Sequence, residues 1–362
     1  MNNRIFNFSA GPAVLPLEVL IEAQAEFLNY QQTGMSILET SHRSKAYEAI
    51  NAEAEANMKE LLGIGDNYRV LFLQGGASTQ FAMIPMNFLS EGRTADYVVT
   101  GAWSEKALKE AKLFGNTHVA ATTVEGNYKR VPRMDEIQLS DNPAYVHITS
   151  NNTIFGTQWD TLPSFGQVPL IADMSSDILN KPFNAEDFSL IYAGAQKNLG
   201  PSGVTVVVIR KELLENNPKN ISAMMRYETH SKNDSLYNTP PAFSVYMLNL
   251  VLRWLKAQGG LVGIGKRNVE KAGFVYDTID QSGGFYRGHA DLGSRSLMNV
   301  TFRLPNEDLE KIFAKEAEQA GLVGLKGHRS VGGLRASIYN AMPVAGCQSL
   351  KDFMVEFQRK NG

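Results

Sequence analysis

The chain has 362 residues, 43% of them hydrophobic, and a formal net charge of −2 at pH 7. This size and composition predict a globular protein with one large core and a smaller second one. The near-neutral charge offers no basic surface for nucleic acid, and no apolar run approaches the roughly 18 residues of a membrane span. With Cys347 as the only cysteine and no secretory signal at the start, we expect a cytoplasmic protein.

Short apolar runs alternate with helical patterns over the first two thirds of the chain. The runs predict strands at residues 68–74, 96–101, 144–149, 168–173, 190–194 and 204–209, with helices at 79–89 and 104–115. These strands are apolar throughout, which is typical of strands buried on both faces. The expected fold class is therefore α/β, with a mostly parallel sheet covered by helices.

The pattern changes near residue 255. A long helix is predicted at 245–260, where two glycines end it, followed by a strand at 296–304 and helices at 306–321 and 349–362. This part predicts a smaller α+β C-terminal domain. We assign residues 16–255 to the large domain, and residues 1–15 and 256–362 to the small one.

Polar residues directly follow several predicted strands. In an open α/β sheet, ligands bind where the carboxyl ends of the strands face loops and helix starts. The first such segment, GGASTQ (Gly75–Gln80), lies between a strand and a helix. Its glycines let the backbone approach a ligand, and amides at a helix start bind phosphate. By itself the segment also fits an ordinary capped turn, and it is neither a Walker motif nor a dinucleotide fingerprint.

Trp103 and Asp173 occupy the same kind of position after two further strands. A tryptophan is usually part of a core, but at a strand end it can stack on a flat ring. A carboxylate at a strand end often caps a helix, but it can also pair with a protonated pyridine nitrogen. Neither residue decides between its two interpretations alone.

Lys197 lies in AGAQKNLGPSG, between an apolar run and a glycine–proline turn. Most lysines are solvated, yet a desolvated lysine near another cation has a lowered pKa and can form a Schiff base with an aldehyde. Together the phosphate loop, Trp103, Asp173 and Lys197 match the phosphate, ring, nitrogen and aldehyde of pyridoxal 5′-phosphate. The sequence therefore predicts this cofactor.

Longer motifs resemble the phosphoserine aminotransferase family, which are fold-type I pyridoxal-phosphate enzymes. The resemblance extends over nearly the whole chain. It is carried by FNFSAGPAVLP (6–16), SHRSK (41–45), GGASTQF (75–81), GAW (101–103), AGAQKNLGPSG (193–203), NTPP (238–241), GHRSVGGLRASIYNAMP (327–343) and DFMVEF (352–357).

The resemblance implies a role for each matching cofactor residue. Lys197 and Asp173 are the implied catalytic residues, with Lys197 on the aldehyde and Asp173 on the ring nitrogen. The other implied cofactor contacts are Trp103 on the ring, Ala77, Ser78 and Gln196 on the phosphate, Thr153 on the 3-oxygen side, and Asn238 and Thr239 from the neighbouring subunit of a homodimer. Some members have arginine where this chain has Ser78, so its loop depends more on hydroxyls and backbone dipoles. No metal is implied.

The resemblance also implies substrate contacts. Arg335 matches the residue that pairs with the α-carboxylate, for which a guanidinium fork is well suited. The pairs His42–Arg43 and His328–Arg329 are expected to bind the distal phosphate or carboxylate, with one pair from the partner chain. A lone His–Arg pair is usually a surface feature, but here both lie within matching motifs.

The implied reaction is a reversible ping-pong transamination of 3-phosphohydroxypyruvate with L-glutamate, giving O-phospho-L-serine and 2-oxoglutarate for serine biosynthesis. Family members also act on 4-phosphohydroxy-L-threonine in pyridoxal-phosphate synthesis. The alternative is another fold-type I aminotransferase, such as the alanine–glyoxylate type. Such an enzyme would not need two His–Arg pairs to bind a distal anion. A cysteine desulfurase is disfavoured because Cys347 lies outside any matching motif. A nicotinamide dehydrogenase lacks its glycine fingerprint here, and a non-catalytic binding protein is the third option.

Overall fold

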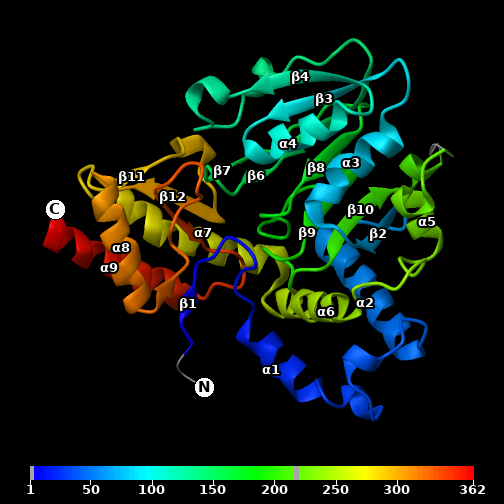
Figure 1. Cartoon of the computed structure of the whole chain (residues 1–362), viewed down its shortest axis with the longest axis horizontal. Coiled ribbons are helices and arrows are strands. Elements are labelled where there is room, and N and C mark those ends of the chain that lie inside the picture. The colour runs from blue at the N-terminus through cyan, green and yellow to red at the C-terminus, as the bar shows by residue number, and fades with distance from the viewer. Residues whose placement is uncertain (1–3, 216–219) are drawn as a thin grey trace.

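The large sheet organises the first two thirds of the structure, a computed structural model that describes residues 4–215 and 220–362 (Figure 1). Its strand order is β2–β10–β9–β8–β5–β3–β4. The strands are β2 (Tyr68–Leu73), β3 (Thr94–Val99), β4 (Asn116–Thr122), β5 (Pro143–Thr149), β8 (Leu170–Asp173), β9 (Leu190–Gly194) and β10 (Thr205–Arg210). Only β10 runs antiparallel to its neighbours, so the carboxyl ends of the other strands share one edge.

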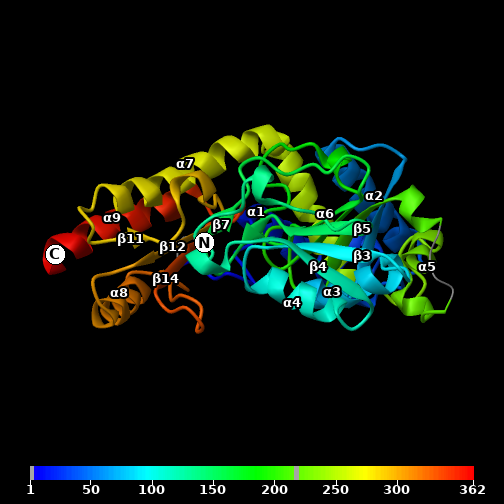
Figure 2. The same cartoon turned by 90° about the horizontal axis from the view of Figure 1, so that it is seen from above.

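Both faces of this sheet are buried, as the continuous apolar runs predict. On β2, Val70 and Phe72 join one core while Leu71 and Leu73 join another, because successive side chains of a strand point to opposite faces. Figure 2 shows α2 (Lys45–Leu62) and α6 (Ala242–Ala257) on one side of the sheet, and α3 (Gly76–Phe88) and α4 (Ala102–Ala111) on the other. Each such apolar side chain contributes roughly 1.5–3 kcal/mol when fully buried.

The six predicted strands of the large sheet are confirmed, but β4 was not predicted. It lies at the edge of the sheet, and most of its residues are partly or fully exposed. Its sequence, NTHVAAT, is consequently too polar to form an apolar run. The two predicted helices are also present, and each begins two or three residues earlier than expected.

The predicted helix at 245–260 is α6, which ends at Ala257. The chain turns at Gly259, whose φ of 88° is a left-handed conformation that favours glycine, and a second helix, α7 (Gly260–Asp280), begins at once. Sequence reasoning missed α7 because its four glycines disfavour a helix. Two further α-helices, α1 (Leu17–Glu26) and α5 (Tyr227–Lys232), also belong to this part.

A second, antiparallel sheet lies in the C-terminal part, with the order β11–β12–β14. Its strands are β11 (Arg287–Gly288), β12 (Asn299–Arg303) and β14 (Leu334–Ser337), and it packs with α7, α8 (Glu307–Gln319) and α9 (Val344–Asn361). The helices α7 and α9 lie side by side in both views (Figures 1 and 2). This is the predicted α+β arrangement.

The N-terminal segment joins the C-terminal part. The short strand β1 (Phe6–Asn7) pairs with β13 (Leu322–Val323), and Phe8 belongs to a third core whose other members lie between Ala272 and Phe357. This separate core supports our proposed division into residues 16–255 and residues 1–15 with 256–362, although residues 1–3 lie outside the described part. Within the described ranges, no helix is both long and apolar enough to cross a bilayer.

Candidate active site

The carboxyl edge of the large sheet collects the predicted cofactor residues. Ser78 follows β2, Trp103 follows β3 and Asp173 ends β8. Thr153 lies in the turn between two short strands, β6 (Asn151–Asn152) and β7 (Thr157–Gln158), directly after β5, and Lys197 follows β9. Since these strands are parallel, residues distant in sequence meet at this edge.

Lys197 is partly buried at the centre of this group. Its Nζ donates a hydrogen bond to Thr153 Oγ1 at 2.8 Å and lies 5.4 Å from the ring centre of Trp103. Burial lowers the pKa of Lys197 to about 8; the nearby carboxylate of Asp173 opposes this shift, and the guanidinium of Arg335 adds to it. A larger fraction of neutral amine at physiological pH makes this lysine a better nucleophile and base than a solvated one.

Asp173 is buried, and burial raises the pKa of its carboxyl group. Hydrogen bonds to Ser175, whose backbone N–H lies 2.9 Å away, and the charge of Lys197 oppose that rise. Among the described residues, no arginine or lysine forms a salt bridge with Asp173. A buried carboxylate without a directly bound cation is suited to receive the N–H of a protonated ring.

Two buried residues that sequence reasoning missed, Tyr192 and His147, support Asp173 from the interior of the sheet. The Tyr192 side chain is one of the groups that oppose the rise in the pKa of Asp173 that burial causes. Its hydroxyl lies 2.9 Å from Nε2 of His147. Burial lowers the pKa of His147 to about 3, so this imidazole is neutral and adds no charge. Both residues are internal to predicted strands, where they look like ordinary core residues.

The start of α3 has the geometry that suits an anion-binding site. Gly75 and Gly76 have φ values of 90° and 65°, and a Cβ on Gly75 would lie 1.9 Å from Thr79 Oγ1, so only glycine fits there. The amides of Ala77 and Ser78 find no hydrogen-bond acceptor among the described residues. Free amides at a helix N-terminus bind phosphate through hydrogen bonds and the helix dipole.

Gln196 lies directly before Lys197 and is likewise only partly buried. A Cβ on Gly194, the last residue of β9, would lie 2.8 Å from Gln196 Oε1, so the side chain folds back over the end of its own strand. The structure therefore places Gln196 at the carboxyl edge, as predicted.

Arg335 reaches this edge from β14 of the small sheet. One of its terminal nitrogens lies 3.4 Å from the carbonyl oxygen of Thr153, the same residue whose hydroxyl accepts from Lys197. Burial lowers the pKa of Arg335, and its buried Nε has no acceptor among the residues that the structure describes. A buried guanidinium with a free donor is suited to receive a carboxylate.

The loop before β14 carries the pair His328–Arg329. His328 and Arg335 line one cavity of about 120 Å³, whereas Arg329 is exposed. Partial burial lowers the pKa of His328, and the neighbouring cations Arg335 and Arg329 lower it further. The loop that carries this pair therefore lies next to Arg335.

Four predicted residues do not join the group within the described chain. His42 and Thr239 line a different hollow, of about 400 Å³, and Arg43 beside them is exposed. Asn238 donates to the carbonyl oxygen of Thr239, which also accepts from the Gln74 side chain at 3.2 Å. The segment 238–239, which was predicted to serve a neighbouring subunit, therefore lies at the same hollow as His42, a hollow that Lys197 does not line.

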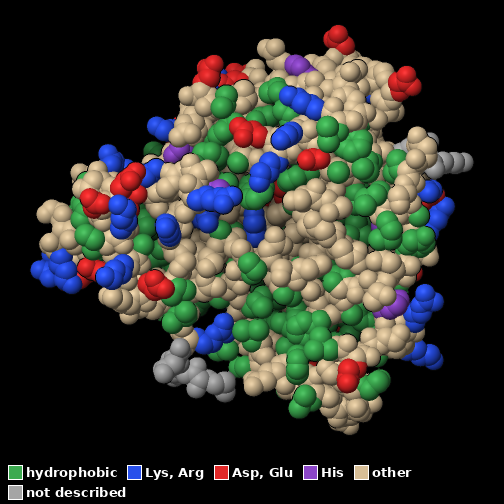
Figure 3. All heavy atoms as spheres, viewed as in Figure 1, with side chains coloured by type: hydrophobic (Ala, Val, Ile, Leu, Met, Phe, Trp, Pro, Cys, Tyr) green, Lys and Arg blue, Asp and Glu red, His purple; other side chains and the backbone are tan. Residues whose placement is uncertain are grey.

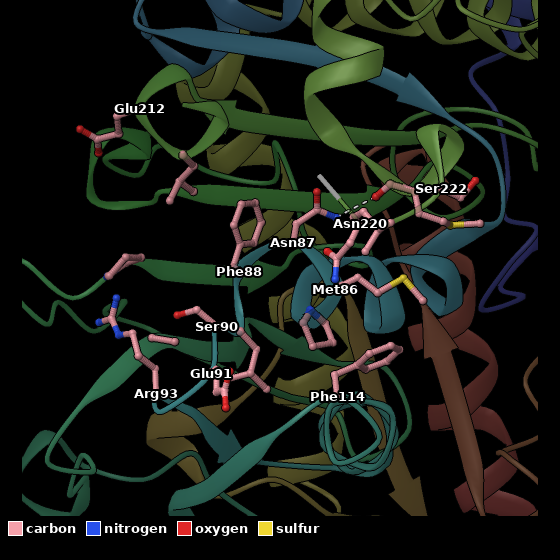
Figure 4. Close-up of a pocket in the computed structure, with 17 residues that line it drawn as sticks. Met86, Asn87, Phe88, Ser90, Glu91, Arg93, Phe114, Glu212, Asn220 and Ser222 are labelled. Atoms are coloured by element: carbon pink, nitrogen blue, oxygen red, sulfur yellow. Dashed lines mark hydrogen bonds between the residues drawn. The ribbon is translucent and has the colours of Figure 1, made fainter. Parts of the chain in front are cut away.

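A cavity of about 860 Å³ lies at the opposite edge of the large sheet (Figure 4). Its walls include Phe88 at the end of α3, Arg93 before β3, and Pro169 before β8. None of the predicted site residues lines it. Cavity size by itself does not locate the site in this protein, and the polar groups at the carboxyl edge do.

The carboxyl edge fits pyridoxal phosphate. Trp103 Nε1 and Arg335 Nε are buried without an acceptor, Asp173 lacks a bound cation, and the amides that open α3 are free among the described residues. A substrate carboxylate would satisfy Arg335, a protonated ring nitrogen would pair with Asp173, and a phosphate would accept from the amides, while the cofactor ring would stack on the face of Trp103. The fold and this edge define a fold-type I pyridoxal-phosphate-dependent transferase.

Comparison with known proteins agrees with this class. The profile of the Aminotransferase class-V family matches residues 5–350. A phosphoserine aminotransferase from Niallia circulans is 62% identical over 362 residues, which is 100% of both chains. The chain belongs to the class-V aminotransferase family, and its cofactor is pyridoxal phosphate.

Solved structures give the same result. That of phosphoserine aminotransferase from Bacillus circulans subsp. alkalophilus shares 61% identity, with a TM-score of 0.98 over 100% of both chains. A PLP-bound phosphoserine aminotransferase from Trichomonas vaginalis shares 39% identity, with a TM-score of 0.92 over 97% of this chain and 100% of that one. The similarity thus extends over both parts of the chain.

Proposed function

We propose that this chain is a phosphoserine aminotransferase, which transfers the amino group of L-glutamate to 3-phosphohydroxypyruvate and releases O-phospho-L-serine and 2-oxoglutarate. The observation that carries the proposal is the meeting of Lys197 and Arg335 at Thr153, which sets a base beside a carboxylate receptor. The 62% identity with the Niallia circulans phosphoserine aminotransferase supports the choice of substrate.

We assign the cofactor contacts from the positions of the residues. Lys197 would hold the aldehyde, Asp173 the ring nitrogen and Trp103 the ring face, while the start of α3 and Gln196 would hold the phosphate. When bound, pyridoxal phosphate supplies an electrophilic carbon for the amine and a ring that accepts the electron pair of the α-carbon. All other steps depend on side chains of the protein.

Lys197 acts as the base. With a substrate amino acid in the site, its Nζ would remove the α-proton and later return a proton. A pKa of about 8 leaves roughly one tenth of this amine neutral at pH 7, far more than for an ordinary lysine. Arg335 orients the α-carboxylate, and Asp173 keeps its negative charge beside the ring nitrogen.

The distal anion of the substrate is assigned to the two His–Arg pairs. His328 and Arg329 lie on the loop that precedes β14, and His328 lines the cavity of Arg335, so we assign this pair to the site of its own chain. His42 and Arg43 lie with Thr239 in the separate hollow and would serve the site of a partner chain. Charged donors on both sides suit a phosphate or a side-chain carboxylate.

A homodimer is proposed because exposed apolar side chains of the N-terminal region extend to that separate hollow. The exposed large apolar residues between positions 17 and 38 are Leu17, Ile21, Phe27, Leu28, Met35 and Leu38, with Leu28 82% exposed. Leu38 itself lines the hollow. Figure 3 shows hydrophobic side chains gathered over the region of α1 and α6. Burying such a surface against a second copy removes it from water, and we place the dimer in the cytoplasm.

The proposed substrate can be tested with half-reactions. Phosphoserine, glutamate, serine and alanine are mixed in turn with the cofactor-loaded protein, and the cofactor absorbance is followed. Phosphoserine and glutamate are expected to react at least about 100-fold faster than serine and alanine, because two charge-assisted contacts to the distal anion together contribute roughly 3 kcal/mol or more. Preferential reaction with alanine would instead indicate an enzyme of the alanine–glyoxylate type. Phosphohydroxythreonine serves as a further donor to test the four-carbon activity.

Replacing Arg335 by alanine is expected to weaken the binding of both glutamate and phosphoserine. Both amino acids have the α-carboxylate that Arg335 is proposed to bind, and losing a buried charge-assisted pair reduces kcat/KM by roughly 10²-fold or more. The measurement is kcat/KM for glutamate and for phosphoserine, with Arg329→Ala as a comparison that should affect chiefly the distal anion. Unchanged glutamate kinetics in Arg335→Ala would remove this assignment.

A further inference from the structure

Three buried asparagines connect the catalytic loop to the small sheet. Asn198 directly follows Lys197, Asn340 lies three residues after the end of β14, and Asn268 lies on α7. All three side chains are buried. None of them was singled out from the sequence, since an isolated asparagine has no distinctive pattern.

Asn340 is the centre of the network. Its backbone N–H donates to Asn198 Oδ1 at 2.9 Å, and its side-chain amide donates to the carbonyl oxygen of Leu179 at 2.9 Å. Its Oδ1 accepts from Asn268 Nδ2 at 2.8 Å. The same Nδ2 donates to the carbonyl oxygen of Asn180 at 2.8 Å. The network thus joins segments from both sides of the proposed domain boundary.

Each end of the network is held in turn. Asn198 Nδ2 donates to the carbonyl oxygen of Ile178 at 2.7 Å. On α7, one turn after Asn268, the buried Lys271 donates to the carbonyl oxygens of Ile338 and Tyr339 at 2.9 and 2.6 Å. The three consecutive residues after β14, Ile338, Tyr339 and Asn340, are therefore tied to α7 or to the catalytic loop.

A buried network of this kind resists sliding. If the small sheet shifted along the large one, several donors and acceptors would lose their partners away from water, which is unfavourable for each of them. An apolar contact would tolerate the same shift more easily, because it has no directional requirement. The network therefore favours one register between the two parts.

We propose that Asn198, Asn268 and Asn340 are positioning residues that fix the register of Arg335 relative to Lys197. The proposal rests on the proposed function only in that Arg335 holds the α-carboxylate of an amino donor. The base must meet the α-proton while the carboxylate is bound, and a misplacement of about 1 Å can reduce the rate by roughly 10²-fold.

The test compares Asn268→Ala and Asn198→Ala with the wild type as cofactor-loaded enzymes. Asn268 is the stronger case because α7 carries no residue assigned to substrate or cofactor. Each variant is expected to slow the single-turnover reaction with saturating amino donor by at least about tenfold. Cofactor content and borohydride labelling of Lys197 are expected to stay as in the wild type.

Asn57→Ala is the matched control. Asn57 is equally buried, and its amide donates to Asn249 Oδ1 at 2.9 Å between α2 and α6, away from the site. We expect it to lower the melting temperature like Asn268→Ala but to leave the single-turnover rate within twofold. A purely structural role for Asn268 would make the two variants behave alike, and that result would overturn the proposal.

A double variant gives a second readout. Because Asn198 and Asn268 act through the same register, their combined loss in rate is expected to be smaller than the product of the single losses. A rate loss in the double variant equal to the product of the two single losses would contradict a shared positioning role. Rates within twofold of the wild type in both single variants would contradict it as well. If one variant does not fold, the other still decides the question against Asn57→Ala.

The amino donor in these experiments is the one that the wild type converts fastest. Phosphoserine, glutamate, serine and alanine all have an α-carboxylate, so the comparison between variants holds even if phosphoserine is not the substrate. If the wild type does not react with phosphoserine, that result would contradict only the proposed function. Slower reaction of the variants with the preferred donor would still support the positioning role of the asparagines.

Discussion

Replacing Lys197 by alanine is expected to abolish transamination and to leave the fold intact. The variant removes the amine that attacks the cofactor and the base that moves the α-proton, so we expect turnover to fall at least about 10³-fold. Its side chain forms one hydrogen bond, to Thr153, and is only partly buried, so folding depends little on it. Turnover and the circular dichroism spectrum measure the two effects, and full activity would refute the assigned role.

Two further experiments, a control variant and a mixed dimer, make this test specific. Lys109→Ala changes an exposed lysine on α4 and should leave turnover unchanged.

Mixed dimers of Lys197→Ala with Arg43→Ala test the shared site. If Arg43 serves the partner chain, one site of each mixed dimer combines both defects and the other is intact, so activity returns. Mixed dimers as inactive as their parents would contradict the shared site.

Asp173→Asn is expected to leave the cofactor bound and to slow proton abstraction by at least about 100-fold. The buried carboxylate keeps the ring nitrogen protonated, and a carboxamide of the same shape cannot supply the negative charge. The charge of Asp173 also raises the pKa of Lys197, so its loss should lower that pKa further. Single-turnover rates with α-deuterated glutamate measure the proton-transfer step directly.

The control for this variant is Asp96→Asn. Asp96 is also buried, on β3, and accepts hydrogen bonds from the backbone and hydroxyl of Ser140. It lies away from the carboxyl edge, so its replacement should reduce stability but not the proton-transfer rate. An unaltered rate in Asp173→Asn would mean that the ring nitrogen has another partner.

The large sheet was predictable because its strands are buried on both faces. The run VPLIAD identifies a strand, and its last residue, Asp173, must then lie at the carboxyl edge. The same reasoning placed Trp103 and Lys197 there. It failed for β4, whose edge position leaves it polar, and for α7, whose glycines are tolerated because the helix packs against α9.

The sequence by itself determined the fold class, the cofactor and the set of groups at the carboxyl edge, because hydrophobic runs and strand ends are local features. Only the tertiary structure decided how Arg335 meets Lys197 through Thr153, how Tyr192 and His147 support Asp173, and how Asn340 ties the two parts together. These contacts join residues far apart in the chain. Their geometry follows from how the small sheet packs against the large one, which no local pattern contains.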